Sequence, residues 1–468
     1  MNKKNYHFSK ITRHLDDNEF SFKQEIIDPH CIDWRKKYKG HAGLIVFPKT
    51  VDKLSNIVKE CSKQNISITP QGGNTSLVGG SVPNKNETGI IINLKNINKI
   101  RKIDELGFSV IVESGCILED IQNFIKKKNM IFPISMGSRG SCQIGGNIAT
   151  NAGGLNVIKY GLLRHNILGL EAVMSDGKIY SNLNNIKKNN TGYDLKQLLI
   201  GSEGTLGIIT AANIKLFSKS KEERVIFASF NSFNDLLDFY RFIINSFNDL
   251  ITSFEMINND SMELVIKHNS SLNHFIEKGN YYCLVELSNF INIPDFYDLI
   301  INNLSKINVT VNSILVSKSQ EENTKLWKYR EAIPPSETKE KICIQHDISI
   351  PLEFMNVFLK KTIQKISKLS DDTHFINFGH LGDNNLHFNI LSSEFTNYKR
   401  LLKNKKKITE IIYENVSKFK GSFSAEHGIG QLKKSELRKY KSKEEIKQML
   451  SIKHNFDPKN ILNPGKIF

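Results

Sequence analysis

Six glycines fall within one stretch of 19 residues, Met136-Gly-Ser-Arg-Gly-Ser-Cys-Gln-Ile-Gly-Gly-Asn-Ile-Ala-Thr-Asn-Ala-Gly-Gly154. Two further glycine-rich loops flank it in the chain, Pro70-Gln-Gly-Gly-Asn-Thr-Ser-Leu-Val-Gly-Gly80 and Gly201-Ser-Glu-Gly-Thr-Leu-Gly207. Glycine lets the backbone adopt positive φ or approach a ligand closely. Successive exposed N–H groups in such loops bind anions, of which a cofactor diphosphate is the usual one. Three such loops within one domain of roughly 200 residues predict a cofactor site.

The spacing of these glycines excludes two common cofactor folds. None of the three loops has the Gly-x-Gly-x-x-Gly pattern between a strand and a helix that marks a Rossmann nicotinamide or flavin site. The Gly-x4-Gly-Lys-Ser/Thr loop of nucleoside triphosphatases is also missing. The cofactor site must therefore be of another design.

Strands and helices alternate around the first glycine loop. Gly43 to Phe47 is a short apolar run, and Ile66 to Thr69 gives a second one. Between them, Thr50 can cap a helix whose apolar residues repeat at helical spacing. The sequence pattern changes near Phe217. After this residue the pattern predicts longer helices and strands, and glycines become few. We predict an α+β protein whose domains span residues 1–218, 219–423 and 424–468, the last segment returning to the first domain.

Composition narrows the protein class. A chain of 468 residues and 53.4 kDa fits two or three domains. No apolar run approaches the ~20 residues of a membrane span, and Met1 to Phe20 lacks the apolar stretch of a secretory signal. Lys3, Lys4, Lys10 and Arg13 precede the first acid, so a mitochondrial-type presequence stays open.

Charge and cysteine content bear on partners and compartment. Six dispersed cysteines without a Cys-x-x-Cys pair fit a reducing compartment. The net charge of +16 comes mostly from scattered lysines, which favours a solvated surface over a nucleic-acid partner.

A histidine motif follows in the second half of the chain. His380-Leu-Gly-Asp-Asn-Asn-Leu-His387-Phe-Asn389 predicts a strand, a tight turn and a strand, with Asn389 on the face of His387. Glu426-His427 follows a strand-like segment, Ser422 to Ala425. Two imidazoles and a carboxylate suit zinc or a similar ion with an open coordination position. Taken alone, such a pair of histidines is more often structural or incidental than metal-binding.

These motifs, with Asn190-Thr-Gly-Tyr-Asp-Leu195, closely resemble those of the FAD-linked oxidases of the vanillyl-alcohol-oxidase type. Within that group the chain is most similar to the D-2-hydroxyglutarate dehydrogenase family and its bacterial D-2-hydroxy-acid relatives. The resemblance covers roughly residues 40 to 468. It implies a two-part, PCMH-type FAD-binding domain, an α+β cap domain with an antiparallel sheet, and a C-terminal segment near the flavin.

The resemblance also implies which residues meet the cofactor. No equivalent of the histidine that attaches flavin in some relatives is found, so we expect non-covalent FAD. The residues expected to line FAD are Gln71, Gly72, Gly73, Asn74, Thr75, Gly137, Ser138, Ser141, Gly145, Gly146, Asn147, Thr150, Gly153, Gly154, Glu203, Gly207, Ile208 and Lys466.

For the substrate side, the resemblance implies that His380, His387 and Glu426 hold a divalent metal, with zinc expected first. Asn389 would then contact substrate and His427 would act as the base. Arg330, in Trp327-Lys-Tyr-Arg-Glu-Ala-Ile-Pro334, would clamp a substrate carboxylate bidentately. Two positions depart from relatives that act on hydroxyglutarate. Pro334 replaces a threonine, and Gln345 replaces a lysine whose charge-assisted contact is worth ~1.5–3 kcal/mol.

The implied activity is FAD-dependent oxidation of a D-2-hydroxy acid, with D-2-hydroxyglutarate as the first choice. The electrons would pass to an electron-transfer flavoprotein, a quinone or a cytochrome. Three alternatives stay open: a D-lactate or glycolate dehydrogenase, a flavin reductase acting on cell-wall precursors, and a non-catalytic flavoprotein subunit. We expect a cytoplasmic protein, or a mitochondrial matrix protein in a eukaryote, and leave a homodimer open.

Overall fold

The computed structural model describes residues 8–85, 89–340, 342–369, 373–392 and 395–468. Lys3 and Lys4 of the possible presequence lie outside these residues. The chain forms two compact units. Unit 1 comprises the described residues of Met1–Gly154, Gly161–Ser218 and Glu426–Phe468, and unit 2 comprises those of Leu155–Tyr160 and Lys219–Ala425.

Unit 1 begins with a four-stranded sheet of order β1-β2-β4-β3. Strands β2, β4 and β3 run parallel, and β1 is antiparallel to β2. The strands are β1 (Phe20–Ser21), β2 (Ala42–Val46), β3 (Ile68–Gln71) and β4 (Gly89–Asn93). Helix α4 (Val51–Gln64) connects β2 to β3, and the Thr50 side chain accepts the Lys53 N–H, which confirms the predicted cap. The shorter helices of this region are α2 (Ser9–Thr12), η1 (Asp17–Glu19), α3 (Gln24–Ile27) and η2 (Asp28–Cys31).

The second sheet of unit 1 is antiparallel, with the order β5-β6-β10-β8-β9. Its strands are β5 (Ile100–Asp104), β6 (Ser109–Glu113), β8 (Ile167–Val173), β9 (Ile179–Asn182) and β10 (Ile208–Lys215). A two-stranded ribbon pairs β7 (Met130–Ile131) with β11 (Phe217–Ser218). The helices are α5 (Leu118–Lys126), α6 (Ile144–Ala149), α8 (Leu163–Asn166) and α9 (Lys196–Leu199). Apolar residues of α5, α6 and the sheet share one core.

The C-terminal segment packs within unit 1, as the sequence predicted. After helices α17 (Lys434–Tyr440) and α18 (Lys443–Phe456), the chain reaches the edge of β3. The Ile68 N–H donates to the Ile461 carbonyl at 2.7 Å, and the Asn463 N–H donates to the Ile68 carbonyl at 2.7 Å. The last residues therefore extend the sheet that ends in the first glycine loop.

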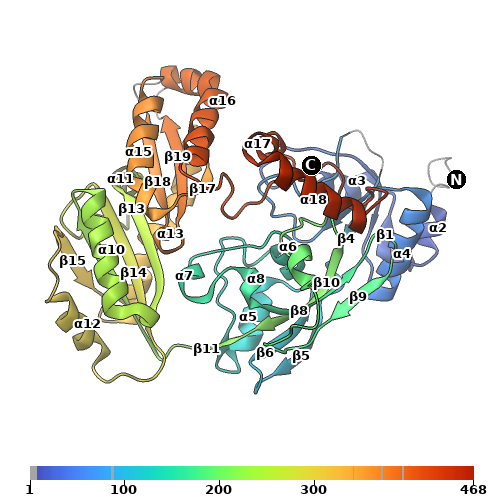
Figure 1. Cartoon of the computed structure of the whole chain (residues 1–468), viewed down its shortest axis with the longest axis horizontal. Helices are drawn as coiled ribbons and strands as arrows, with labels where there is room; N and C mark the ends of the chain where they lie inside the picture. The colour runs from blue at the N-terminus through green and yellow to red at the C-terminus, as the bar shows by residue number, and fades with distance from the viewer. Residues whose placement is uncertain (1–7, 86–88, 341, 370–372, 393–394) are drawn as a thin grey trace. The chain divides into compact units, whose positions relative to one another are not determined.

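Unit 2 is built on an eight-stranded sheet of order β15-β12-β14-β13-β18-β19-β16, with β17 also paired to β19 (Figure 1). All its pairs are antiparallel, as predicted for the cap domain. The strands are β12 (Glu222–Phe230), β13 (Ile251–Asn258), β14 (Tyr281–Asn289), β15 (Ser313–Val316), β16 (Ile342–Ile344), β17 (Asp347–Ser349), β18 (His374–His380) and β19 (Asn385–Ser392). The helices are α7 (Val157–Tyr160), α10 (Phe233–Phe247), η3 (Asn248–Leu250), α11 (Asn259–His268), α12 (Phe296–Leu304), α13 (Gln320–Glu331), α14 (Ile333–Glu337), α15 (Leu352–Ser367), η4 (Leu381–Asp383) and α16 (Phe395–Lys418).

One expected strand is wrong. Ser422 to Ala425 forms a single bridge, between Ser422 and Ser349, instead of a regular strand. The Ser422 hydroxyl donates to the Ser424 carbonyl and accepts the Ser424 N–H. This local side-chain bonding competes with a strand ladder and bends the segment. Among the described residues, no helix has both the length and the apolar character needed to cross a bilayer.

Candidate functional site

The first two glycine-rich loops pack directly on each other in unit 1. A Cβ added to Gly73 would lie 2.0 Å from the Ser141 carbonyl oxygen, so glycine is required for this approach. A Cβ added to Gly145 would be 2.5 Å from the Ser114 Cβ, so glycine is required there too. The contact between Gly73 and Ser141 shows that the two loops lie against each other even though about 70 residues of chain separate them.

Gly146 and Gly137 have open space where a side chain would be. Gly146 is exposed between the buried residues Gly145 and Asn147, and nothing lies within 4 Å of a Cβ built on it or on Gly137. Two buried side-chain oxygens nearby, Asn147 Oδ1 and Gln143 Oε1, have no hydrogen-bond partner in the described part of the chain. Bare backbone beside two unused acceptors fits a ligand that offers hydroxyl or N–H donors, as the ribityl chain and ring of FAD do.

Polar side chains of the first loop, Pro70 to Gly80, bond it to the rest of unit 1. Gln71 is buried, accepts a 2.5 Å hydrogen bond from His30 Nδ1, and donates to the carbonyls of His30 and Ser81. Asn74 has a φ of 53° and donates to the Ile32 carbonyl. Burial lowers the pKa of His30, although the hydrogen bond to Gln71 opposes this shift.

Glu203 in the third loop binds the C-terminal segment. Its carboxylate oxygens accept the backbone N–H groups of Ile429 and Gly430 at 2.7 and 2.8 Å. Burial raises the pKa of Glu203, and these two hydrogen bonds oppose the shift. Asn463 donates to the Glu203 carbonyl and to the Gly80 carbonyl, so the C-terminal segment links the first and third loops.

All the residues expected to line FAD therefore belong to unit 1. Lys466 is buried, and its Nζ donates to Asn84 Oδ1 and to the Pro464 carbonyl. The other expected contacts lie on the loops just described, on α6 or at the start of β10; they are Gly72, Thr75, Ser138, Ser141, Thr150, Gly153, Gly154, Gly207 and Ile208.

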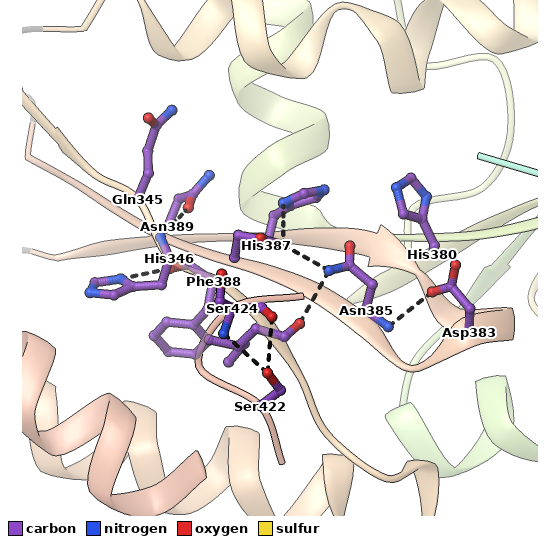
Figure 2. A network of polar contacts seen from close by, with 12 residues as sticks. Gln345, His346, His380, Asp383, Asn385, His387, Phe388, Asn389, Ser422 and Ser424 are labelled. Carbon is purple, nitrogen blue, oxygen red and sulfur yellow. Dashed lines mark hydrogen bonds and ion pairs between the residues drawn. The ribbon is translucent and has the colours of Figure 1, made fainter. Parts of the chain in front are cut away.

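The histidine motif forms the predicted hairpin in unit 2. β18 ends at His380, η4 makes the turn, and His387 on β19 pairs with Phe378. The imidazoles of His380 and His387 lie on the same side of the strands, with ring centroids 5.6 Å apart (Figure 2).

Glu426 completes a group of three possible metal ligands. It directly follows Ala425, whose N–H donates to the Asp347 carbonyl at 3.4 Å. One ligand atom from each of His380, His387 and Glu426 lies within 4.8 Å of the others. Two imidazoles and a carboxylate match the donor set of a catalytic zinc site. The expected base, His427, comes next in the chain and is half-buried.

Each histidine has a carboxylate directly opposite it in the sheet. Glu255 on β13 pairs with His380, and Asp347 on β17 pairs with His387. Glu255 Oε1 lies 2.6 Å from His380 Nδ1, whereas Asp347 Oδ1 lies 4.0 Å from His387 Nδ1. For His380, a carboxylate at Nδ1 leaves Nε2 as the candidate ligand atom.

Arg330 on α13 is joined to the same glutamate. Its Nε donates to Glu255 Oε2 at 2.6 Å, and its guanidinium lies over the Phe378 ring at 4.5 Å from the centroid. Burial opposes ionisation of Glu255, but the charges and hydrogen bonds of His380 and Arg330 outweigh it and lower the pKa of Glu255 to about 2. The two terminal nitrogens of Arg330 have no hydrogen-bond partner among the residues described, so they can bind a carboxylate.

Asn389 and Gln345 converge on a second buried acid, Glu337. Asn389 Nδ2 donates to Glu337 at 2.7 Å and Gln345 Nε2 donates at 3.0 Å, while Asn389 Oδ1 accepts the His346 N–H. Burial raises the pKa of Glu337, and the hydrogen bonds from Asn389 and Gln345 oppose the rise. Asn389, the expected substrate contact, therefore already has protein partners for both amide atoms.

Sequence reasoning missed Glu255 and Glu337. Glu255 had a usable signal, because it is the one acid within the otherwise apolar or neutral strand Ile251–Asn258. Charged residues are rarely buried without a partner. Glu337 follows two prolines at a helix end and gave no comparable signal.

Two family models match the chain. The FAD binding domain matches residues 42–181, and the C-terminal domain of FAD linked oxidases matches residues 219–467. The chain is 36% identical to a mitochondrial D-2-hydroxyglutarate dehydrogenase of Arabidopsis thaliana, covering 95% of this chain and 78% of the relative. It is 35% identical to a D-2-hydroxyglutarate–pyruvate transhydrogenase of Saccharomyces cerevisiae, covering 93% and 88%. It is 37% identical to a putative mitochondrial D-lactate dehydrogenase of Schizosaccharomyces pombe, covering 94% and 84%.

Solved structures agree on the fold. p-Cresol methylhydroxylase superposes with a TM-score of 0.76 at 15% identity, covering 100% of this chain and 97% of the other. Alkyldihydroxyacetonephosphate synthase superposes with a TM-score of 0.74 at 16% identity, covering 98% and 84%. At these identities the likeness establishes the architecture, and it confirms the predicted PCMH-type domain.

Proposed function

The chain belongs to the FAD-linked oxidases, and on that premise we propose that it oxidises a D-2-hydroxy acid to the 2-oxo acid, with D-2-hydroxyglutarate as the first substrate. The curated relatives that match most of its length are named for D-2-hydroxyglutarate or D-lactate. Both are acids with a hydroxyl on the carbon next to a carboxylate. The site must then bind a carboxylate, accept a hydroxyl proton and leave the C–H bond free to react.

Arg330 is suited to the carboxylate. Its Nε is occupied by Glu255, so the remaining fork of two terminal nitrogens is held at a fixed angle. A guanidinium fork binds a planar carboxylate through two parallel hydrogen bonds. Each such charge-assisted contact is worth ~1.5–3 kcal/mol.

His427 is the proposed general base. The hydroxyl proton would pass to its imidazole as the C–H electron pair leaves the carbon and the C=O bond forms. A divalent ion would be held by His380, His387 and Glu426. As a Lewis acid, this ion would make it easier for the substrate hydroxyl to lose its proton near neutral pH. The glycine surface around Gly146 would hold FAD, which when bound serves as the acceptor of two electrons.

The grouping of His380, His387 and Glu426 within 4.8 Å is the observation that carries this proposal. A flavin reductase or a non-catalytic flavoprotein subunit has no need of such a ligand set beside a carboxylate-binding arginine. A D-lactate or glycolate dehydrogenase would need both, and is the second candidate, favoured by the neutral Gln345 where relatives active on hydroxyglutarate carry a cation. Reoxidation would fall to an electron-transfer flavoprotein or a quinone, or to pyruvate as in the yeast transhydrogenase.

Anaerobic flavin reduction tests the proposal. The purified yellow protein is mixed with D-2-hydroxyglutarate, D-lactate or glycolate, each with and without a chelator, and flavin absorbance is followed. We expect bleaching by D-2-hydroxyglutarate that is lost on chelation and restored by zinc. Bleaching only by D-lactate or glycolate would favour the second candidate. No bleaching by any of the three acids would reject the proposed chemistry.

A further inference from the structure

Glu255 occupies a position that neither the motifs nor the proposed chemistry explains. It lies in the middle of β13, its side chain is fully buried, and each of its two oxygens contacts a different group of the site. Oε1 lies 2.6 Å from His380 Nδ1 and Oε2 lies 2.6 Å from Arg330 Nε. These partners come from different elements, His380 from the next strand and Arg330 from a helix about 75 residues along the chain.

The first contact selects one tautomer of His380. A carboxylate is acceptor-only, so in the neutral imidazole Nδ1 must carry the proton and Nε2 keeps its lone pair. The cross-strand register of Glu255 with His380 fixes this contact through the backbone ladder as well as through the side chains. Such outer carboxylates orient ligand imidazoles and raise their basicity, and losing one typically lowers metal affinity roughly 10–100-fold.

The second contact, from Glu255 to Arg330 Nε, determines which edge of the guanidinium can face a substrate. With Nε bound to Glu255, the terminal nitrogens form the only part of the guanidinium left for a substrate. The Phe378 ring beneath it limits rotation out of that plane. The acid Glu337 accepts hydrogen bonds from Asn389 and Gln345 and makes none with Arg330 among the residues described.

We infer that Glu255 is a positioning residue that orients the metal ligand His380 and the carboxylate clamp Arg330 together. This inference rests on the proposed function, since it assigns His380 to the metal and Arg330 to the substrate. A glutamine at this position could accept from only one of the two partners. Its NH2 group would face the other donor, so Arg330 must turn away, or His380 must turn away or take the other tautomer, which puts the proton on Nε2.

The experiment compares wild type, Glu255→Gln, Glu255→Asp and, as a matched control, Glu286→Gln. Glu286 is a buried acid on the adjoining strand that accepts hydrogen bonds from Thr252 and Trp327 and contacts neither His380 nor Arg330. Metal-free proteins are titrated with zinc against a chromophoric chelator. KM and kcat for the hydroxy acid that reduces the wild-type flavin are then measured at saturating zinc.

We expect Glu255→Gln to bind zinc roughly 10–100-fold more weakly than wild type. At saturating zinc its KM should stay raised by about tenfold or more, because Arg330 is no longer held. Glu255→Asp keeps the charge but is one methylene shorter, so it should fold and show a smaller defect in both quantities. Glu286→Gln should match wild type in both.

Two outcomes would overturn the inference. One is a folded Glu255 variant with the zinc affinity of wild type, and the other is a KM that returns fully to the wild-type value once zinc is saturating. If Glu255→Gln does not fold, the zinc affinity and KM of Glu255→Asp decide whether the inference holds. A wild-type protein that binds no zinc, or whose flavin no hydroxy acid reduces, would instead reject the proposed function itself.

Discussion

Replacing Gly146 by alanine tests whether the bare glycine surface of α6 is where FAD binds. The substitution adds one methyl group at a helical position where nothing lies within 4 Å. In the flavin-free protein it should stabilise the helix by roughly 0.5–1 kcal/mol, because glycine is the poorer helix former. With FAD present, the methyl group would occupy space that the cofactor needs.

The expected loss of affinity follows from the cost of overpacking. Forcing an extra methyl group into a filled contact typically costs roughly 1–3 kcal/mol. At 1.36 kcal/mol per tenfold, FAD should bind roughly 5- to 150-fold more weakly. Stability and affinity would thus move in opposite directions.

Gly145→Ala is the matched control on the neighbouring residue. Its Cβ would lie 2.5 Å from the Ser114 Cβ and 3.1 Å from the Ser114 carbonyl oxygen, so the flavin-free protein itself should be destabilised. Urea unfolding of the flavin-free forms gives the stability, and FAD fluorescence titration gives the Kd. A Gly146→Ala protein that binds FAD as tightly as wild type would refute the assignment of this surface.

Three further results are expected. His387→Ala should stay yellow but lose turnover roughly 100-fold or more, and chelator should then have no added effect; stopped-flow flavin reduction measures both. Because the pKa of His30 is lowered on folding, the wild type should lose stability as pH falls below the usual 6.5, and His30→Gln should lose less between pH 7.5 and 5.5 in urea unfolding. Gln345→Lys places a cation beside Glu337 and should raise the kcat/KM ratio of D-2-hydroxyglutarate to D-lactate about tenfold, whereas an unchanged ratio would place residue 345 outside the pocket.

Local patterns were predictable from the sequence, and cross-strand partners were not. The helix after Thr50 and the hairpin from His380 to His387 depend on residues near each other in the chain, so spacing and turn residues were enough. The contact between Glu255 and His380 depends on β13 lying beside β18, about 120 residues later. Nothing in either segment specifies that neighbour or its register. The sequence could only mark Glu255 as an acid in an apolar strand, which predicts a buried partner without identifying it.

Glu203 illustrates how a motif can mark a loop without showing what its side chain binds. The loop Gly201–Gly207 was expected to line FAD with Glu203 among its contacts, yet the carboxylate is bound to the N–H groups of Ile429 and Gly430. A buried carboxylate is costly unless it is hydrogen-bonded, so these contacts are a sufficient reason for an acid at this position. Asn463 bonds the backbone of the same residue. The acid therefore holds the C-terminal segment against the glycine loops, and any contribution of this loop to the cofactor falls first to its backbone.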